Sequence, residues 1–273
     1  MRIYHVSDLH FGDSVNSNKD ANRLLDLVEK DFDAGGQKLL VVTGDVTANG
    51  EEKEYHQAVL GLERFRGHLL VVPGNHDYNW GGNKYEPERA RRFDNSLLKE
   101  LGIAHAYFYR EPEVRTFEDG EEKVLVVGLN SNAMDTDLGG WDAAATGWVT
   151  SGQRTKLSEI LNDGKYSDHW KVVCLHHQVK KGGDPIDLLH DADKVLDVVR
   201  RRVQVLAFGH TCGGPIPNYP PDPGDLAYTP ASPDGRPHLL NANLSVLWRQ
   251  YFRVTFPGAY AEGKQPFVEL KRG

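Results

Sequence analysis

The segment His68–Asp77 reads HLLVVPGNHD, a short apolar run followed by a proline, a glycine and three polar residues that can bind a metal ion. The run is typical of a buried β-strand, because it is short and rich in branched apolar residues. Gly74 lets the backbone turn sharply where a side chain would crowd a cation. The segment therefore predicts a strand that delivers Asn75, His76 and Asp77 to its carboxyl end.

Four other apolar runs end in the same way. They are followed by Asp8-Leu9-His10, by Gly44-Asp45, by His176-His177 and by Gly209-His210-Thr211-Cys212. Ligands of an open α/β sheet bind outside the carboxyl ends of its strands, so these clusters should converge on one crevice. Each pattern alone is common by chance, but its recurrence at successive strand ends predicts a metal site.

The runs alternate with amphipathic helical patterns, which indicates βαβ units and an α/β fold with a largely buried sheet. The predicted strands are 2–7, 38–43, 68–73, 123–129, 171–175 and 203–208, and the predicted helices are 20–32, 54–65, 153–161 and 187–201, with a helical insertion near 87–101. The C-terminal segments 238–246, 249–256 and 265–270 are predicted as a strand meander that forms a second sheet or one half of a mixed sheet. We expect a single domain over residues 1–273, with a Pro- and Gly-rich loop at 213–237.

Composition restricts the class of protein. The chain has 273 residues, 39% hydrophobic and 26% charged, which is typical of a globular protein. Its net charge of −7 argues against a nucleic-acid partner, which would require clustered Lys and Arg. The two cysteines form no disulfide framework, and we see neither a leader nor an apolar stretch long enough for a membrane span. We therefore expect a cytoplasmic protein with no membrane partner.

The series DLH, GD, GNHD, H and GH, in this order and at strand ends, resembles the calcineurin-like metallophosphoesterases. Within that family it is most similar to the small-molecule phosphodiesterase branch. The resemblance extends through the motifs from residue 6 to residue 212, and the C-terminal NANLS at 241–245 is similar to the family's closing strands. It implies a four-layer α/β/β/α sandwich of the metallo-dependent phosphatase type. The implied cofactors are two divalent or trivalent transition-metal ions: Mn, Fe, Zn, Co or Ni.

The resemblance also implies a role for each motif residue. Asp45 would bridge the two metal ions, and such a carboxylate holds two cations about 3.5–4 Å apart. The first metal would be held by Asp8 and His10, and the second by Asn75, His176 and His210.

His76 would be the catalytic residue, as proton donor to the leaving oxygen or as stabiliser of developing charge, with Asp77 orienting it. Asp77 read alone could also be a turn residue. The predicted substrate-binding residues are Asn75, His76 and His177. For His177, the residues themselves leave open a supporting or surface role.

Cys212 departs from the family pattern, which usually closes with GHxH and uses the last histidine for the first metal. A thiolate can bind Zn or Fe, so Cys212 is predicted as a softer ligand. In a second interpretation the first metal loses this ligand and is completed by water or another side chain. In a third, Cys212 is a small buried residue that points away.

The predicted function is metal-dependent hydrolysis of a small-molecule phosphodiester or phosphomonoester, in which a hydroxide bridging the two metals attacks phosphorus. One alternative is a nuclease on the same scaffold, which would need a basic groove. The other is a non-catalytic binding module with a weakened first metal site, as Cys212 could indicate.

Overall fold

The computed structural model describes residues 1–32, 36–78, 86–107, 111–132, 146–179, 189–210, 228–232, 235, 237–242 and 249–272. Within these ranges the strands form two mixed sheets. The first, in the order β11-β10-β1-β2-β3, contains β1 (Arg2–Val6), β2 (Lys38–Thr43), β3 (Leu69–Val72), β10 (Gln250–Thr255) and β11 (Phe267–Arg272). The second, in the order β4-β5-β6-β7-β9-β8, contains β4 (Glu113–Asp119), β5 (Glu122–Gly128), β6 (Trp170–Cys174), β7 (Val205–Phe208), β8 (Tyr228–Thr229) and β9 (His238–Asn241).

Parallel pairing aligns the carboxyl ends of the central strands. In the first sheet β1, β2 and β3 are parallel, with Val6 opposite Val42 and Thr43 opposite Val72. In the second sheet β5, β6, β7 and β9 are parallel. Their residues are almost all buried, as expected for apolar strands covered on both faces. The six predicted strands are confirmed, and no end differs by more than two residues.

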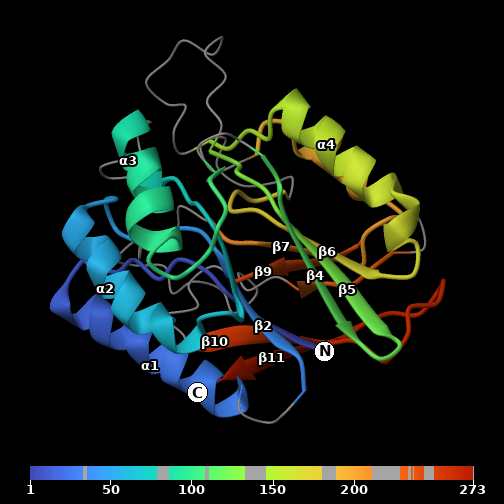
Figure 1. Ribbon diagram of the computed structural model, residues 1–273, viewed down its shortest axis with the longest axis horizontal. Coiled ribbons are helices and arrows are strands. Elements are labelled where there is room, and N and C mark those ends of the chain that lie inside the picture. Colours follow the sequence, from blue (N-terminus) through green and yellow to red (C-terminus); the bar gives the residue numbers. More distant parts are fainter. Residues whose placement is uncertain are drawn as a thin grey trace, which may run out of the picture.

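Helices cover the outer faces of the two sheets (Figure 1). The first sheet is covered by α1 (Val15–Phe32) and α2 (Glu52–Leu62), and the second by α4 (Ser151–Asn162) and α5 (Ala192–Val199). The insertion forms α3 (Pro87–Arg92) and the π-helical turn η4 (Phe93–Leu98), which packs on α2. The described residues also include the short 3₁₀ turns η1 (Glu63–Phe65), η2 (His76–Tyr78) and η6 (Gly164–Tyr166). Among the described residues, every helix is too short or too polar to cross a lipid bilayer.

The layers follow from the two-residue alternation of the strands. In β5, Val124 and Val126 face a core shared with the first sheet and helices α1 and α2, whereas Leu125 and Val127 face a second core with α4 and α5. Apolar residues on both faces thus place one sheet against the other and a helix layer outside each. The predicted four-layer α/β/β/α sandwich is confirmed.

Three features differ from the sequence predictions. The C-terminal strands are not one meander, because β9 joins the second sheet beside β7 whereas β10 and β11 extend the first sheet from β1. Strand β4, which was not predicted, forms a hairpin with β5. Helix α1 begins at Val15 and not at Asp20, since Ser14 Oγ accepts a hydrogen bond from the backbone N–H of Ser17 and caps an earlier first turn. The Pro/Gly-rich loop at 213–237 lies mostly outside the described residues.

His5 in β1 predicts a pH dependence of stability. Its ring is completely buried, with Nε2 2.8 Å from Thr43 Oγ1, and burial lowers its pKa to about 3. Below pH 6.5 the unfolded chain therefore binds a proton that the folded chain does not, and folding loses stability as pH falls. Between pH 8 and pH 5, metal-free wild type should lose about 2 kcal/mol more of its unfolding free energy than His5→Phe. Urea titrations at the two pH values measure this; equal losses would contradict it.

Candidate metal centre

Left-handed backbone conformations gather at the predicted ligands. Among the described residues, six non-glycine residues have positive φ, and four of them are Asp8 (57°), His10 (47°), Asp45 (49°) and His210 (50°). A non-glycine residue in this region costs about 1 kcal/mol or more, and such strain persists where the surrounding structure imposes it. These four residues stand directly after β1, β2 and β7, so the strain lies at the strand ends that the sequence predicted to be functional.

Two glycines allow the strand ends to approach one another. A Cβ on Gly74 would lie 2.2 Å from both the backbone nitrogen and Oδ1 of Asp45. A Cβ on Gly209 would lie 1.8 Å from Ser7 Oγ and 2.6 Å from Asp8 Oδ2. Neither glycine has a positive φ, so each is needed for close approach.

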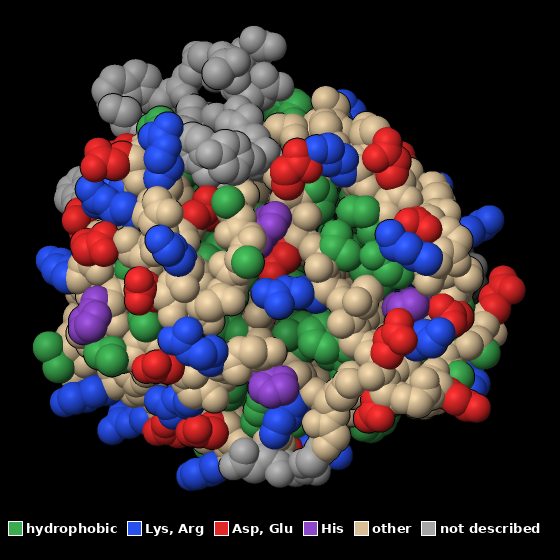
Figure 2. Space-filling view, viewed as in Figure 1, with side chains coloured by type: hydrophobic (Ala, Val, Ile, Leu, Met, Phe, Trp, Pro, Cys, Tyr) green, Lys and Arg blue, Asp and Glu red, His purple; other side chains and the backbone are tan. Residues whose placement is uncertain are grey.

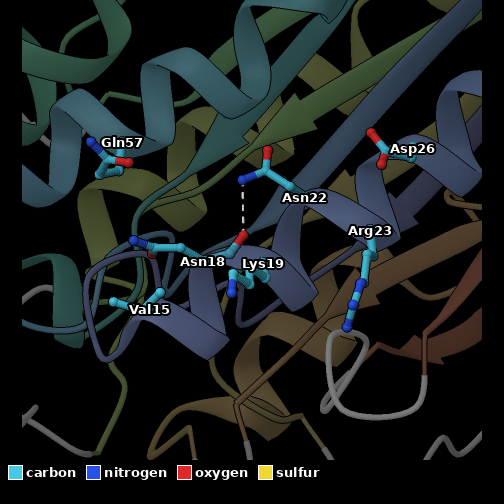
Figure 3. A pocket seen from close by; sticks show the side chains of 7 residues that line it. All are labelled: Val15, Asn18, Lys19, Asn22, Arg23, Asp26 and Gln57. Atoms are coloured by element: carbon cyan, nitrogen blue, oxygen red, sulfur yellow. Dashed lines mark hydrogen bonds between the residues drawn. The ribbon is translucent and has the colours of Figure 1, made fainter.

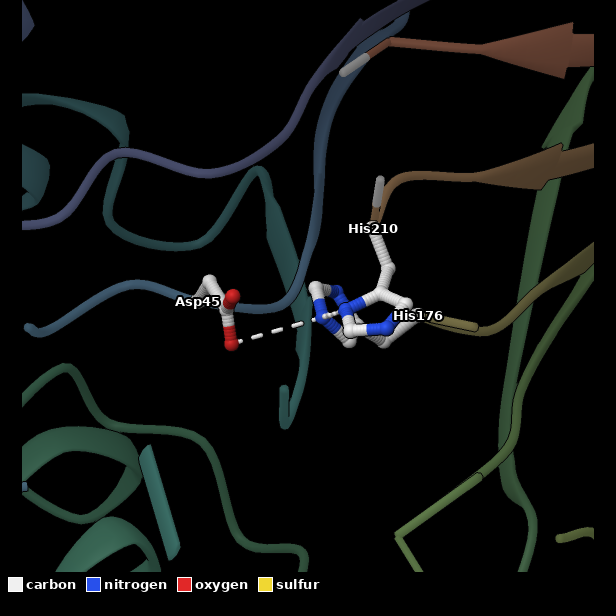
Figure 4. A group of neighbouring side chains, drawn as sticks. All are labelled: Asp45, His176 and His210. Atoms are coloured by element: carbon white, nitrogen blue, oxygen red, sulfur yellow. Dashed lines mark hydrogen bonds and ion pairs between the residues drawn. The ribbon is translucent and has the colours of Figure 1, made fainter. Parts of the chain in front are cut away.

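Four strand ends supply a compact cluster of donor atoms, of which Figure 4 shows Asp45, His176 and His210 turned toward one another. The three offer ligand atoms that all lie within 4.8 Å of one another. His176 Nε2 lies 3.0 Å from Asn75 Oδ1, 3.1 Å from His210 Nδ1 and 3.3 Å from Asp45 Oδ1. The structure thus brings together all four residues predicted for the second metal.

These spacings fit a transition-metal ion. Two adjacent ligands at ordinary Zn–N or Zn–O distances are separated by about 3.0–3.5 Å. The opposite ring nitrogen, His176 Nδ1, lies 2.7 Å from the carbonyl oxygen of Thr43, a bond that directs Nε2 into the cluster. Imidazole, carboxylate and amide oxygen together suit a first-row transition metal.

A second donor group shares Asp45. Asp8, His10 and Asp45 also offer ligand atoms within 4.8 Å of one another, and His10 Nε2 lies 3.8 Å from Asp45 Oδ2. The two groups therefore use different oxygens of one carboxylate. Cys212, the further predicted ligand on this side, lies outside the described residues.

The electrostatics of the cluster favour bound positive charge. Burial opposes ionisation of Asp45, but His176, His76 and His10 outweigh it and hold the pKa of Asp45 well below its ordinary value. Burial likewise disfavours the imidazolium of His176, yet Asp45 and Asp8 raise the pKa of His176 to about 9. A metal cation can replace this proton, so metal binding would release it.

His76 lies beside the shared carboxylate. Its backbone N–H donates to Asp45 Oδ1 (2.9 Å), and its ring stands edge-on to that of His10 with centroids 4.8 Å apart. Nδ1 donates to the carbonyl oxygen of Ala48 (2.8 Å). This bond orients the ring and leaves Nε2 as the nitrogen that can face a ligand.

Asp77 has different partners from those that the sequence predicted. Its carboxylate accepts from the backbone N–H groups of Val46 (3.2 Å), Thr47 (2.9 Å) and Gly74 (2.9 Å) and from the Thr47 hydroxyl (2.9 Å). Within the described residues it makes no hydrogen bond to the His76 ring. Burial, joined by the charge of Asp45, raises the pKa of Asp77 to about 6. Asp77 thus stabilises the loop that carries Asp45 and Ala48. It orients His76 only indirectly, because the His76 ring is hydrogen-bonded to Ala48 in that loop.

His177 is buried beside the second group. Its ring lies 4.5 Å from that of His210, between centroids, and its Nδ1 lies 2.8 Å from Ser131 Oγ. Burial, with the neighbouring histidines, lowers its pKa well below the ordinary value. The surface position that the sequence left open is wrong, because the side chain is fully buried.

Ser131 and Asn132 take part in the site and were missed by the sequence analysis. Ser131 Oγ accepts the backbone N–H of His176 (3.2 Å), and Asn132 Nδ2 donates to the carbonyl oxygen of Pro73 (2.9 Å). Both follow β5. The signal was available, since Asn130-Ser131-Asn132 directly follows an apolar run, as the ligands do elsewhere.

Other surface features lie apart from these residues. A hollow of about 490 Å³ is lined only by side chains of α1 and α2: Val15, Asn18, Lys19, Asn22, Arg23, Asp26 and Gln57 (Figure 3). It includes none of the predicted site residues. On the face shown in Figure 2, acidic and basic side chains are interspersed.

This fold and this group of donors are consistent with one family of metal-binding proteins: the chain belongs to the calcineurin-like phosphoesterase family, whose model matches residues 1–214. A curated relative, "Probable glycerophosphodiester phosphodiesterase GpdQ" from Arcobacter nitrofigilis, is 26% identical over 179 residues. That match covers 64% of this chain and 55% of the relative, so the chain spans about half the relative's length.

Solved structures support the fold. A dimetal phosphatase from Danio rerio superposes with a TM-score of 0.67 at 12% identity, covering 98% of each chain. A 5′-nucleotidase precursor from Thermus thermophilus superposes with a TM-score of 0.51 at 17% identity, covering all of this chain and 54% of the other.

Proposed function

We propose that the chain is a dinuclear phosphoesterase that hydrolyses a small-molecule phosphodiester or phosphomonoester. The observation that carries the proposal is the pair of donor groups that share Asp45 through different oxygens. Asp8 and His10 would hold one ion, Asn75, His176 and His210 would hold the other, and Asp45 would be a ligand of both.

Two such ions, when bound, supply positive charge to the phosphoryl oxygens and lower the pKa of water towards neutrality. The chain itself provides the groups that orient and move protons. Because His76 Nδ1 donates to Ala48, a proton on Nε2 makes the ring an imidazolium that can donate to the leaving oxygen. Asp77 supports this geometry by holding the loop that contains Ala48.

A small diester is the first substrate to test, because the curated relative is named as a glycerophosphodiester phosphodiesterase. Monoesters remain in the proposal, since the similar solved structures include a phosphatase and a 5′-nucleotidase precursor. The interspersed charges on the face in Figure 2 and the net charge of −7 favour a small substrate over a nucleic acid.

The experiment uses metal-free protein with Mn²⁺, Ni²⁺, Co²⁺ or Zn²⁺ added singly, and bis-p-nitrophenyl phosphate and p-nitrophenyl phosphate as substrates. We expect turnover that appears only with metal and that is lost in Asp45→Ala. If no metal supports turnover of either substrate, the proposed function is wrong. The same holds if Asp45→Ala hydrolyses them at the wild-type rate.

A further inference from the structure

The hydroxyl of Ser131 has three polar neighbours, all belonging to the His176-His177 segment. Its Oγ lies 3.2 Å from the backbone nitrogen of His176, 3.1 Å from that of His177 and 2.8 Å from His177 Nδ1. A serine hydroxyl has one proton to donate and two lone pairs that accept. Backbone N–H groups can only donate, so the two of them occupy both lone pairs of Ser131.

The single proton of Ser131 must therefore point at the third neighbour, Nδ1 of His177. That nitrogen is an acceptor and carries no proton of its own. The neutral ring of His177 consequently has its proton on Nε2, so this nitrogen is a hydrogen-bond donor with no lone pair for a metal ion.

The Nε2 atom of His177 is buried and has no hydrogen-bond partner among the described residues. A buried donor left without an acceptor is costly, which indicates that a bound molecule completes it. The ring cannot readily turn away. Gly147 lies against one side, where a Cβ would be 2.2 Å from His177 Cγ, and His210 lies 4.5 Å away between ring centroids.

We infer that His177 is a substrate-binding residue whose Nε2–H donates a hydrogen bond to a phosphoryl oxygen, and that Ser131 is a positioning residue that fixes this tautomer. The inference rests on the proposed function. A phosphoryl oxygen suits the position, because His177 lies beside His176 and His210, the imidazoles assigned to the second metal ion. An anionic oxygen bound to that side of the centre accepts such a hydrogen bond strongly.

The test measures binding of inorganic phosphate to Zn²⁺-loaded protein by calorimetry, together with the ¹⁵N NMR shifts of the His177 ring. We expect the Nε2–H tautomer in wild type and a mixture of tautomers in Ser131→Ala. His177→Phe should bind phosphate about 10- to 100-fold more weakly with unchanged zinc content. His177→Gln, which retains an N–H donor near the position of Nε2, should recover part of the affinity.

The matched control is His169→Phe, a buried histidine just before the opposite end of β6, which should bind phosphate as wild type does. An Nδ1–H tautomer in wild type would overturn the inference, as would wild-type phosphate affinity in His177→Phe, or no phosphate binding by wild type. Metal-dependent hydrolysis with unchanged affinity in His177→Phe would leave the proposed function standing. If phosphate binding depends on His177 but no metal supports hydrolysis, the role of His177 in binding would stand and the proposed function would be wrong.

Discussion

Replacing Asp45 by asparagine should lower kcat/KM for bis-p-nitrophenyl phosphate on the order of 10³-fold or more, because bound metal supplies several kcal/mol of transition-state stabilisation. Asp45 is the only residue common to both donor groups found in the described residues. An amide retains the shape of the carboxylate but lacks its charge, and one of its two ends is a donor that cannot bind a cation. Both metal ions should therefore bind more weakly.

Asp31→Asn is the matched control for this change. Asp31, at the end of α1, accepts hydrogen bonds from Tyr251 and Arg253 and lies apart from the donor groups. It should lose stability but retain activity and metal content. Activity of Asp45→Asn within tenfold of wild type, at full metal content, would remove Asp45 from its proposed role.

Replacing Gly74 by alanine should be the second most severe change. The added Cβ would lie 2.2 Å from the backbone nitrogen and Oδ1 of Asp45, far inside van der Waals contact. The Asp45 loop cannot retreat cheaply, because Asp77 binds the N–H groups of Val46 and Thr47. We expect about 1–3 kcal/mol lower unfolding free energy from this overpacking. A displaced Asp45 should weaken metal binding about 10- to 100-fold, as disturbed ligand support does elsewhere.

Gly152→Ala is the corresponding control. Gly152 lies in the first turn of α4, and the nearest atom to its added Cβ is Thr150 Oγ1 at 4.0 Å. This substitution should leave metal affinity unchanged and raise stability slightly, because alanine favours the helix. Thermal unfolding and zinc titration of both variants test the contrast. Equal behaviour of the two alanine variants would show that close approach at Gly74 is unimportant.

The strand ends were the part of the site that the sequence could predict. An apolar run followed by a metal-binding residue, with or without a glycine between them, is a local pattern, and parallel pairing brings such ends together in any sheet of this kind. Asp8, Asp45 and His210 were found in this way, and the structure places their side chains in two overlapping groups.

Contacts between segments far apart in sequence could not be predicted. Asp77 was assigned to its neighbour His76, yet its carboxylate reaches back to the loop after β2, some thirty positions earlier. The tautomer of His177 depends on Ser131 at the end of another strand. The division of the C-terminal strands between two sheets is equally invisible to periodicity, because alternation reveals a buried face but not the sheet that covers it.

The backbone adds a feature that side-chain patterns do not show. Asp8, His10, Asp45 and His210 all have left-handed conformations, which are uncommon for residues other than glycine. Each of these four is a residue whose side chain contributes to the donor groups. Backbone strain at the strand ends thus lowers the stability of the fold, and the same conformations direct these side chains towards common points.

The most direct test is the number of metal ions that one chain binds. Metal-free protein reconstituted with Mn²⁺ or Zn²⁺ would be measured by native mass spectrometry, which counts the ions retained by the folded chain. Two overlapping donor groups predict two ions for wild type and fewer for Asp45→Asn. A wild-type chain that binds one ion or none, while folded and under saturating metal, would contradict the dinuclear centre.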